Sequence, residues 1–138
     1  MTSMAELETM TRTIWAEARG EPSAGQLAVG WVIQNRVKDN RFPDGYAEVC
    51  LQPMQFSCWN TGTPSIPEVR LYEPAWVLAL ETALAVMTRK VDDPTKGATH
   101  YLNIDETRKL RRNHDLPDWV SSLKVTAMIG RHTFLRAY

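Results

Sequence analysis

Residues 12–22 have the sequence RTIWAEARGEP, and this stretch decides how the first half of the chain folds. Met10 and Ile14, just before and within it, recur at a helical spacing and predict an amphipathic helix over residues 5–18. Gly20 then ends that helix, because glycine is favoured just past a helix C-terminus.

Glu17 falls on the apolar face of this helix, in its last turn. Charged side chains are rarely buried unless paired, and apolar surroundings together with the negative end of the helix dipole should raise the pKa of the carboxyl. A raised pKa suits a general acid that must hold its proton near neutral pH. The pattern alone leaves a second interpretation open, an ion pair with Arg19 or Arg36.

Two further helices are predicted downstream. Ser23 and Gln26 have the spacing of a capping box at the start of the second helix, which ends before the turn-forming residues from Asp39 onward. Pro74 suits the first turn of the third helix. The apolar face expected for that helix consists of Trp76, Leu80, Leu84 and Met87.

The remaining chain is predicted to be irregular or extended. Residues 49–73 contain several prolines and no clear period, and a long loop in a compact domain is often functional. Residues 98–103 have a strand-like pattern, as have residues 124–134, which are interrupted at Gly130. Helices followed by short strands predict an α+β domain with a small antiparallel sheet.

Composition fits one domain spanning residues 1–138. Sixteen basic residues balance sixteen acidic ones, so the net charge gives no sign of a nucleic-acid or anionic-membrane partner. The sequence contains no apolar run of about 18 residues and no recognisable signal peptide. Cys50 and Cys58 are expected to be free thiols, because small disulfide-dependent domains usually carry more cysteines.

Several segments resemble, in order, the motifs of the SleB-type cell wall hydrolases, which include spore cortex-lytic enzymes and phage endolysins. The resemblance covers nearly the whole chain, and a set of motifs in one order is more specific than any single motif. The segments are residues 12–22, 28–37, 41–43, 55–59, 97–103, 117–119 and 129–134.

This resemblance implies a lysozyme-like fold related to lytic transglycosylases. It also implies cleavage of the β-1,4 bond between N-acetylmuramic acid and N-acetylglucosamine, with Glu17 as catalytic acid/base. Glycosidases normally use two carboxylates, but Glu21 follows the glycine turn and is expected to be solvated or to act as a cap. A mechanism with one carboxylate is therefore expected, and attack by the substrate's own C6 hydroxyl or by water is left open.

Polar and aromatic side chains in the later motifs suit a sugar-binding site. Hydroxyl and amide groups can hydrogen-bond sugar substituents, and aromatic rings can stack on pyranose faces. A structural role is open for part of this set, since Trp59 can belong to the core and Thr99 and Asn103 can cap the sheet. The predicted substrate-binding residues are Gln55, Ser57, Trp59, Thr99, Tyr101 and Asn103.

Parts of the sequence are compatible with four other functions. A zinc amidase would draw its ligands from the histidines and cysteines, but these lack a compact ligand spacing, so neither a metal nor a cofactor is predicted. A cysteine peptidase would pair Cys58 with His100 or His132. A helix-turn-helix would need the second helix to face DNA, and a non-catalytic glycan-binding module would have no use for Glu17.

The expected partner is the glycan strand of peptidoglycan, and a monomer is expected. Longer family members add an export signal and a peptidoglycan-binding domain, so the sequence favours a single-domain endolysin. Such a protein would stay in the host bacterial cytoplasm until a holin released it to the cell wall.

Overall fold

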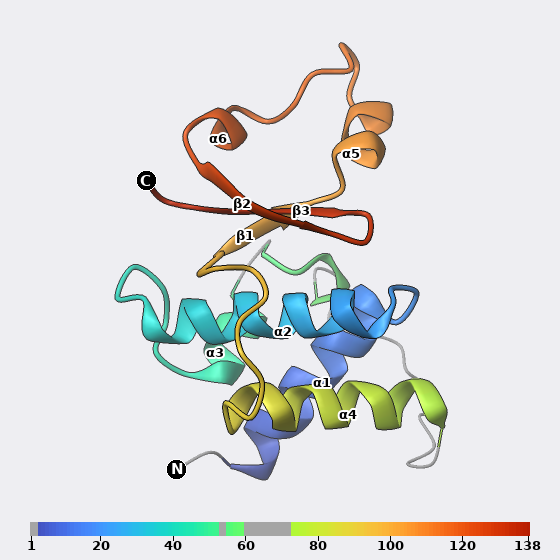
Figure 1. Cartoon of the computed structure of the whole chain (residues 1–138), viewed down its shortest axis with the longest axis vertical. Coiled ribbons are helices and arrows are strands. Elements are labelled where there is room, and N and C mark those ends of the chain that lie inside the picture. Colours follow the sequence, from blue (N-terminus) through green and yellow to red (C-terminus); the bar gives the residue numbers. More distant parts are fainter. Residues whose placement is uncertain (1–2, 53–54, 60–72) are drawn as a thin grey trace.

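The predicted α+β class is confirmed by the computed structural model, which describes residues 3–52, 55–59 and 73–138 (Figure 1). Helices come first and a three-stranded antiparallel sheet follows. The elements are α1 Met4–Ala18, α2 Ser23–Lys38, α3 Tyr46–Leu51, the 3-10 turn η1 Ser57–Trp59, α4 Pro74–Met87, β1 His100–Leu102, α5 Ile104–Leu110, α6 Asp118–Ser121, β2 Lys124–Ile129 and β3 His132–Arg136.

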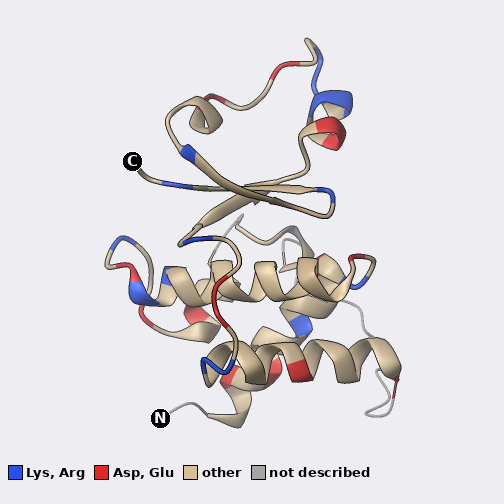
Figure 2. Ribbon diagram, viewed as in Figure 1, with Lys and Arg blue, Asp and Glu red and all other residues tan. Residues whose placement is uncertain are grey.

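The helix α2 forms the middle layer of the molecule. Figure 1 shows α1 and α4 on one side of it and the sheet on the other. Its buried residues serve both sides, because Ile33 belongs to the core shared with α1 and α4, while Ala28 and Val32 pack with Phe134 of β3. Figure 2 shows few charges along α2, as expected for a helix covered on both faces.

The helices α1, α2 and α4 approach one another at Gly30. A side chain there would meet Val86 of α4 at 3.1 Å and Ile14 of α1 at 3.4 Å. A glycine at this crossing therefore allows the three helices to pack closely, and the position of α1 and its last residue, Ala18, is fixed by that packing.

Two local predictions were wrong. The capping box at Ser23 does not form, because Ser23 is already the first residue of α2 and Gln26 instead donates to the backbone carbonyl of Glu21 at 3.3 Å. The buried face of α4 is also rotated, so that Leu84 is exposed. Small residues, which allow a close helix approach, provide much of that face, which consists of Trp76, Ala79, Thr82, Ala83 and Val86.

The sheet has the order β1-β3-β2, with both pairs antiparallel. The predicted break at Gly130 is confirmed as the turn between β2 and β3, where Gly130 has a φ of +59°. The short helices α3, α5 and α6 were not predicted. Of the segment 49–73 predicted to be irregular, residues 53–54 and 60–72 lie outside the described residues.

The half-buried carboxylate of Asp93 holds the segment before β1 against α2. Asp93 accepts hydrogen bonds from the backbone of Thr95 and Gly97 and from the side chain of Asn35, at 2.8, 2.9 and 2.8 Å. Asn35 also donates to the carbonyl of Ala98 at 2.9 Å. The start of β1 is therefore fixed to α2 by polar contacts.

Among the described helices, none is long and apolar enough to span a bilayer.

Candidate active site

Glu17 lies in the last turn of α1 and is half-buried. The packing of α1 brings it near η1 and β1, which are distant in sequence. Its negative charge acts on Cys58 of η1 and on Tyr101 of β1, and it raises the pKa of both groups in addition to the effect of their burial. Arg36 of α2 acts on Tyr101 in the opposite direction. We call Glu17, Arg36, Cys58 and Tyr101 the Glu17 cluster.

Tyr101 is held by two aromatic neighbours from β3. Its ring stacks on Phe134 with the centroids 5.7 Å apart, and the His132 ring meets it edge-on at 4.9 Å. Burial, and then the charge of Glu17, raise the pKa of the phenol well above its usual range. The hydroxyl beside Glu17 therefore remains protonated at neutral pH and can donate a hydrogen bond.

The two cysteines are free thiols, as predicted. Burial raises the pKa of Cys50 to about 12. Burial, the charge of Glu17 and a hydrogen bond with its side chain raise the pKa of Cys58 to about 12. A nucleophilic cysteine needs a lowered pKa, because the thiolate is the reactive form. These surroundings therefore oppose the cysteine peptidase interpretation.

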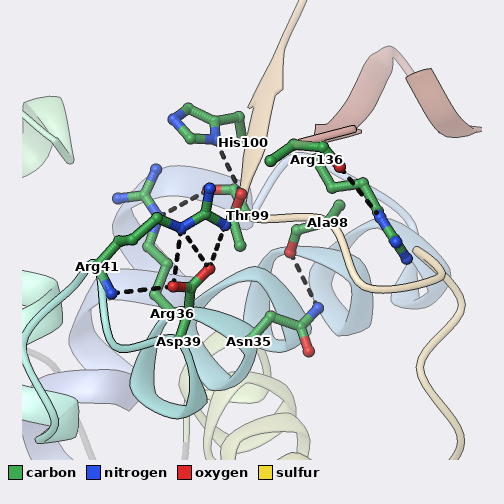
Figure 3. A network of polar contacts seen from close by, with 9 residues as sticks. Asn35, Arg36, Asp39, Arg41, Ala98, Thr99, His100 and Arg136 are labelled. Atoms are coloured by element: carbon green, nitrogen blue, oxygen red, sulfur yellow. Dashed lines mark hydrogen bonds and ion pairs between the residues drawn. The ribbon is translucent and has the colours of Figure 1, made fainter. Parts of the chain in front are cut away.

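Arg36 connects the cluster to the chain entering β1, and sequence reasoning gave it no such role. Its guanidinium donates from Nε to the Thr99 carbonyl at 2.7 Å (Figure 3). It also donates from Nη1 to Oε1 of Gln55 at 3.1 Å. It also lies over the rings of Phe42 and Phe56. An arginine among the closely spaced apolar residues of α2 was the available signal, but its partners are remote in sequence.

The predicted substrate-binding residues divide into two groups. Gln55 is exposed and accepts a hydrogen bond from Arg36 of the Glu17 cluster, and Tyr101 is itself a member of that cluster. Thr99 is buried, and its hydroxyl contacts Nδ1 of His100 at 3.0 Å. Ser57 begins η1, and its side chain lies outside the described part of the chain.

Trp59 and Asn103 already have structural partners. The indole of Trp59 donates to the Thr13 hydroxyl at 2.9 Å and packs against the core. The side-chain oxygen of Asn103 accepts from the backbone of Glu106 at 3.0 Å, so that it caps α5. Asn103 also lines a hollow of about 510 Å³ between α5 and the β2–β3 turn. Sugar contacts by these two residues stay predictions.

The expectation that Glu21 is solvated or a cap was wrong. Its side chain is only 8% exposed, and its carboxylate lies 3.5 Å from Nδ1 of His132 and 3.6 Å from Nε of Arg131. The β2–β3 turn folds back over the α1–α2 connection and covers this side chain. Glu21 is therefore a buried, paired carboxylate, and sequence spacing gave no sign of its distant partners.

The structure also bears on the zinc and DNA-binding interpretations. Within the described ranges, no group of three or more His, Cys, Asp and Glu residues is arranged to hold a metal ion. The helix α2, which would have to enter a DNA groove, is covered by α1, α4 and the sheet. It therefore cannot serve as a recognition helix in this fold.

Comparison with known sequences agrees with this architecture. The pattern of the Cell Wall Hydrolase family matches residues 20–135. The chain belongs to this family. The family match begins at residue 20, after Glu17. The catalytic role of Glu17 therefore does not follow from this match and depends on the motif at residues 12–22. The predicted membership of a cell wall hydrolase family is thereby confirmed.

Individual family members support the same relationship. A spore cortex-lytic enzyme of Halalkalibacterium halodurans is 30% identical over 94% of this chain, but the match spans only 34% of that enzyme. The SleB catalytic domain of Bacillus anthracis, described as a germination-specific lytic transglycosylase, superposes with a TM-score of 0.74 at 26% identity, covering 97% of this chain and 96% of that domain. The Bacillus cereus SleB catalytic domain gives 0.72 at 26% identity, covering 99% of this chain and 93% of that domain.

Proposed function

We propose that this chain cleaves the glycan strands of peptidoglycan at the β-1,4 bond between N-acetylmuramic acid and N-acetylglucosamine, with Glu17 as general acid and then base. The observation that carries the proposal is the half-buried Glu17 carboxylate beside the neutral Tyr101 and Cys58, in a SleB-type fold. Because those neighbours remain protonated at neutral pH, they can donate hydrogen bonds without competing for a proton.

The reaction starts when Glu17 protonates the glycosidic oxygen as the bond to C1 breaks. The substrate's N-acetyl group supports the developing cation, and its C6 hydroxyl then attacks C1. The ionised Glu17 accepts the proton of that hydroxyl, which leaves a 1,6-anhydro muramic acid end. A water molecule in place of the C6 hydroxyl would give hydrolysis at the same site.

A second catalytic carboxylate is not part of this proposal. Glu21 is the nearest acid along the chain, but its burial against His132 and Arg131 favours a structural pairing over attack on a sugar. Gln55 and Tyr101 are proposed to contact the substrate because of their positions beside the cluster.

The proposal is tested by digesting peptide-bearing sacculi with wild type and Glu17→Gln and identifying the soluble products by mass spectrometry. Glu8→Gln is the matched control, because Glu8 lies on the same helix and is exposed. We expect products ending in 1,6-anhydro muramic acid from wild type and the control, and none from Glu17→Gln. Reducing muramic acid ends would mean that water attacks. Released stem peptides, or full activity of Glu17→Gln, would contradict the proposal.

We propose two further properties of this chain. The first is that it acts as an endolysin, which a holin releases from the host cytoplasm to the cell wall. The second is that the active form is a monomer. Expression of the chain in a bacterial host, with and without a holin, tests the first point. Lysis that depends on the holin is expected, and equal lysis without it would contradict the role. Sedimentation of the purified chain tests the second.

A further inference from the structure

We propose that Glu21 is a positioning residue, which holds the His132 ring against Tyr101 and so fixes Tyr101 beside Glu17. The inference rests on the proposed function, because it assigns to Glu21 an indirect part in the reaction of Glu17. Three structural relationships support it: the space made for Glu21, its contact with His132, and the contact of His132 with Tyr101.

The fold makes room for the Glu21 side chain by placing glycine on two sides of it. A Cβ at Gly25 would lie 2.9 Å from Cβ of Glu21, and a Cβ at Gly130 would lie 2.9 Å from its Oε2. Both distances are shorter than carbon–carbon or carbon–oxygen contacts allow. The first turn of α2 and the β2–β3 turn therefore enclose this carboxylate.

The enclosed carboxylate meets a buried imidazole nitrogen. Oε1 of Glu21 lies 3.5 Å from Nδ1 of His132, and the His132 side chain is 13% exposed. Within the described residues, this nitrogen is shielded from solvent and makes no hydrogen bond of standard geometry. A buried polar atom without a partner is costly, and the Glu21 carboxylate, 3.5 Å away, is the acceptor placed closest to pairing with it.

The His132 ring links Glu21 to the Glu17 cluster, because it also contacts Tyr101. Its ring packs edge-on against Tyr101, with the centroids 4.9 Å apart, and the same tyrosine responds to the charge of Glu17. The charged groups acting on His132 are Glu21 and Arg131, while burial lowers its pKa. Burial keeps the ring neutral near pH 7, and the Glu21 carboxylate, which can only accept, favours the neutral tautomer that carries its proton on Nδ1.

A double-variant cycle tests whether Glu21 acts through His132. The variants are Glu21→Gln, which keeps the size of the side chain, and His132→Phe, which keeps an aromatic ring against Tyr101. We expect each to lower the rate at saturating glycan by about tenfold with little change in KM, since misplaced groups lose rate before binding. The double variant should be no slower than the slower single variant.

Arg131→Gln is the matched control, because Arg131 contacts the same carboxylate but is mostly exposed. We expect its rate to stay within about twofold of wild type, as exposed ion pairs contribute little. Multiplicative losses in the double variant, or wild-type rates in a folded Glu21→Gln, would overturn the inference. An inactive wild type would instead overturn the proposed function.

Nitrogen NMR of the wild-type protein gives a test that needs no variant. The expected signal of His132 at neutral pH is that of the Nδ1–H tautomer. In Glu21→Gln, the pKa of His132 should fall further below its usual value, because the carboxylate that raises it is gone. A wild-type Nε2–H tautomer would show that Glu21 does not orient the ring.

Discussion

The guanidinium of Arg36 donates a hydrogen bond of 2.7 Å from Nε to the backbone carbonyl of Thr99, and this contact joins α2 to the chain entering β1. Arg36 is 4% exposed and also donates to Gln55. The Glu17 cluster thus contains a buried cation whose donors are used by groups from two other segments.

Arg36→Lys should therefore destabilise the fold, although it keeps the charge. Lysine cannot reproduce the forked donors or the contacts with Phe42 and Phe56. Loss of charged hydrogen bonds in a buried site predicts a decrease of about 2–4 kcal/mol in the free energy of unfolding, measured in urea. Arg111→Gln is the control, since its pair with Asp115 is exposed. Equal midpoints for wild type and Arg36→Lys would contradict this role.

Gly30→Ala should destabilise the crossing of three helices. The added Cβ would lie 3.1 Å from Cγ2 of Val86, so that side chain must shift, and 3.4 Å from Cδ1 of Ile14, which leaves no free space on that side. Overpacking of this kind costs about 1–3 kcal/mol. The control is Gly20→Ala, where the nearest atom lies 3.9 Å away, on the flexible side chain of Arg131. Thermal unfolding of both variants is the measurement, and a melting temperature for Gly30→Ala at or above that of Gly20→Ala would refute the packing argument.

The sequence predicted those parts of the fold whose signals are local. Helical periodicity located α1, and Gly130 located the turn between β2 and β3. The short helix α5 was missed because none of its residues is buried, so it has no apolar face to detect. Its cap was nevertheless visible, since Asn103 and Glu106 have the spacing of a capping box.

The site was predicted less completely, because its connections are tertiary. Glu17 was found from its place on an apolar helix face, and Tyr101 from its motif. Arg36 uses a backbone carbonyl and a side chain from distant segments, which no local period reveals. The burial of Glu21 likewise depends on a hairpin near the other end of the chain.

Acid should destabilise the protein through His100. Burial, and then the charges of Arg36 and Arg41, lower the pKa of His100 to about 4, whereas an unfolded histidine titrates near 6.5. Between these values the unfolded chain binds more protons, so stability should fall as the pH falls from about 6.5 to about 4. His100→Gln should flatten the pH dependence of the urea midpoint in this window. His114→Asn is the control and should leave this pH dependence unchanged, because His114 is exposed. If the urea midpoint of His100→Gln changed with pH as steeply as that of wild type, His100 would not be the group responsible.

Cys58→Ser should retain glycan cleavage. The pKa of Cys58, raised to about 12, leaves almost no thiolate at neutral pH, and serine can replace the donor beside Glu17. Iodoacetamide should likewise react slowly with the wild-type protein near pH 7. The release of soluble glycan fragments is measured with and without iodoacetamide. Rapid alkylation with loss of activity, together with an inactive Cys58→Ser, would restore the cysteine peptidase interpretation.

Tyr101→Phe tests whether the phenol hydroxyl itself contributes beside Glu17. The ring contacts with Phe134 and His132 do not need the hydroxyl, so the fold should be kept. The protonated hydroxyl can donate to the ionised Glu17 or to the substrate, and a hydrogen bond to a charged group is worth about 10- to 100-fold in rate. We expect a loss in that range in saturating glycan-cleavage assays, with an unchanged melting temperature. Tyr138→Phe is the control because Tyr138 is exposed. A Tyr101→Phe rate equal to that of the control would show that only the ring is required.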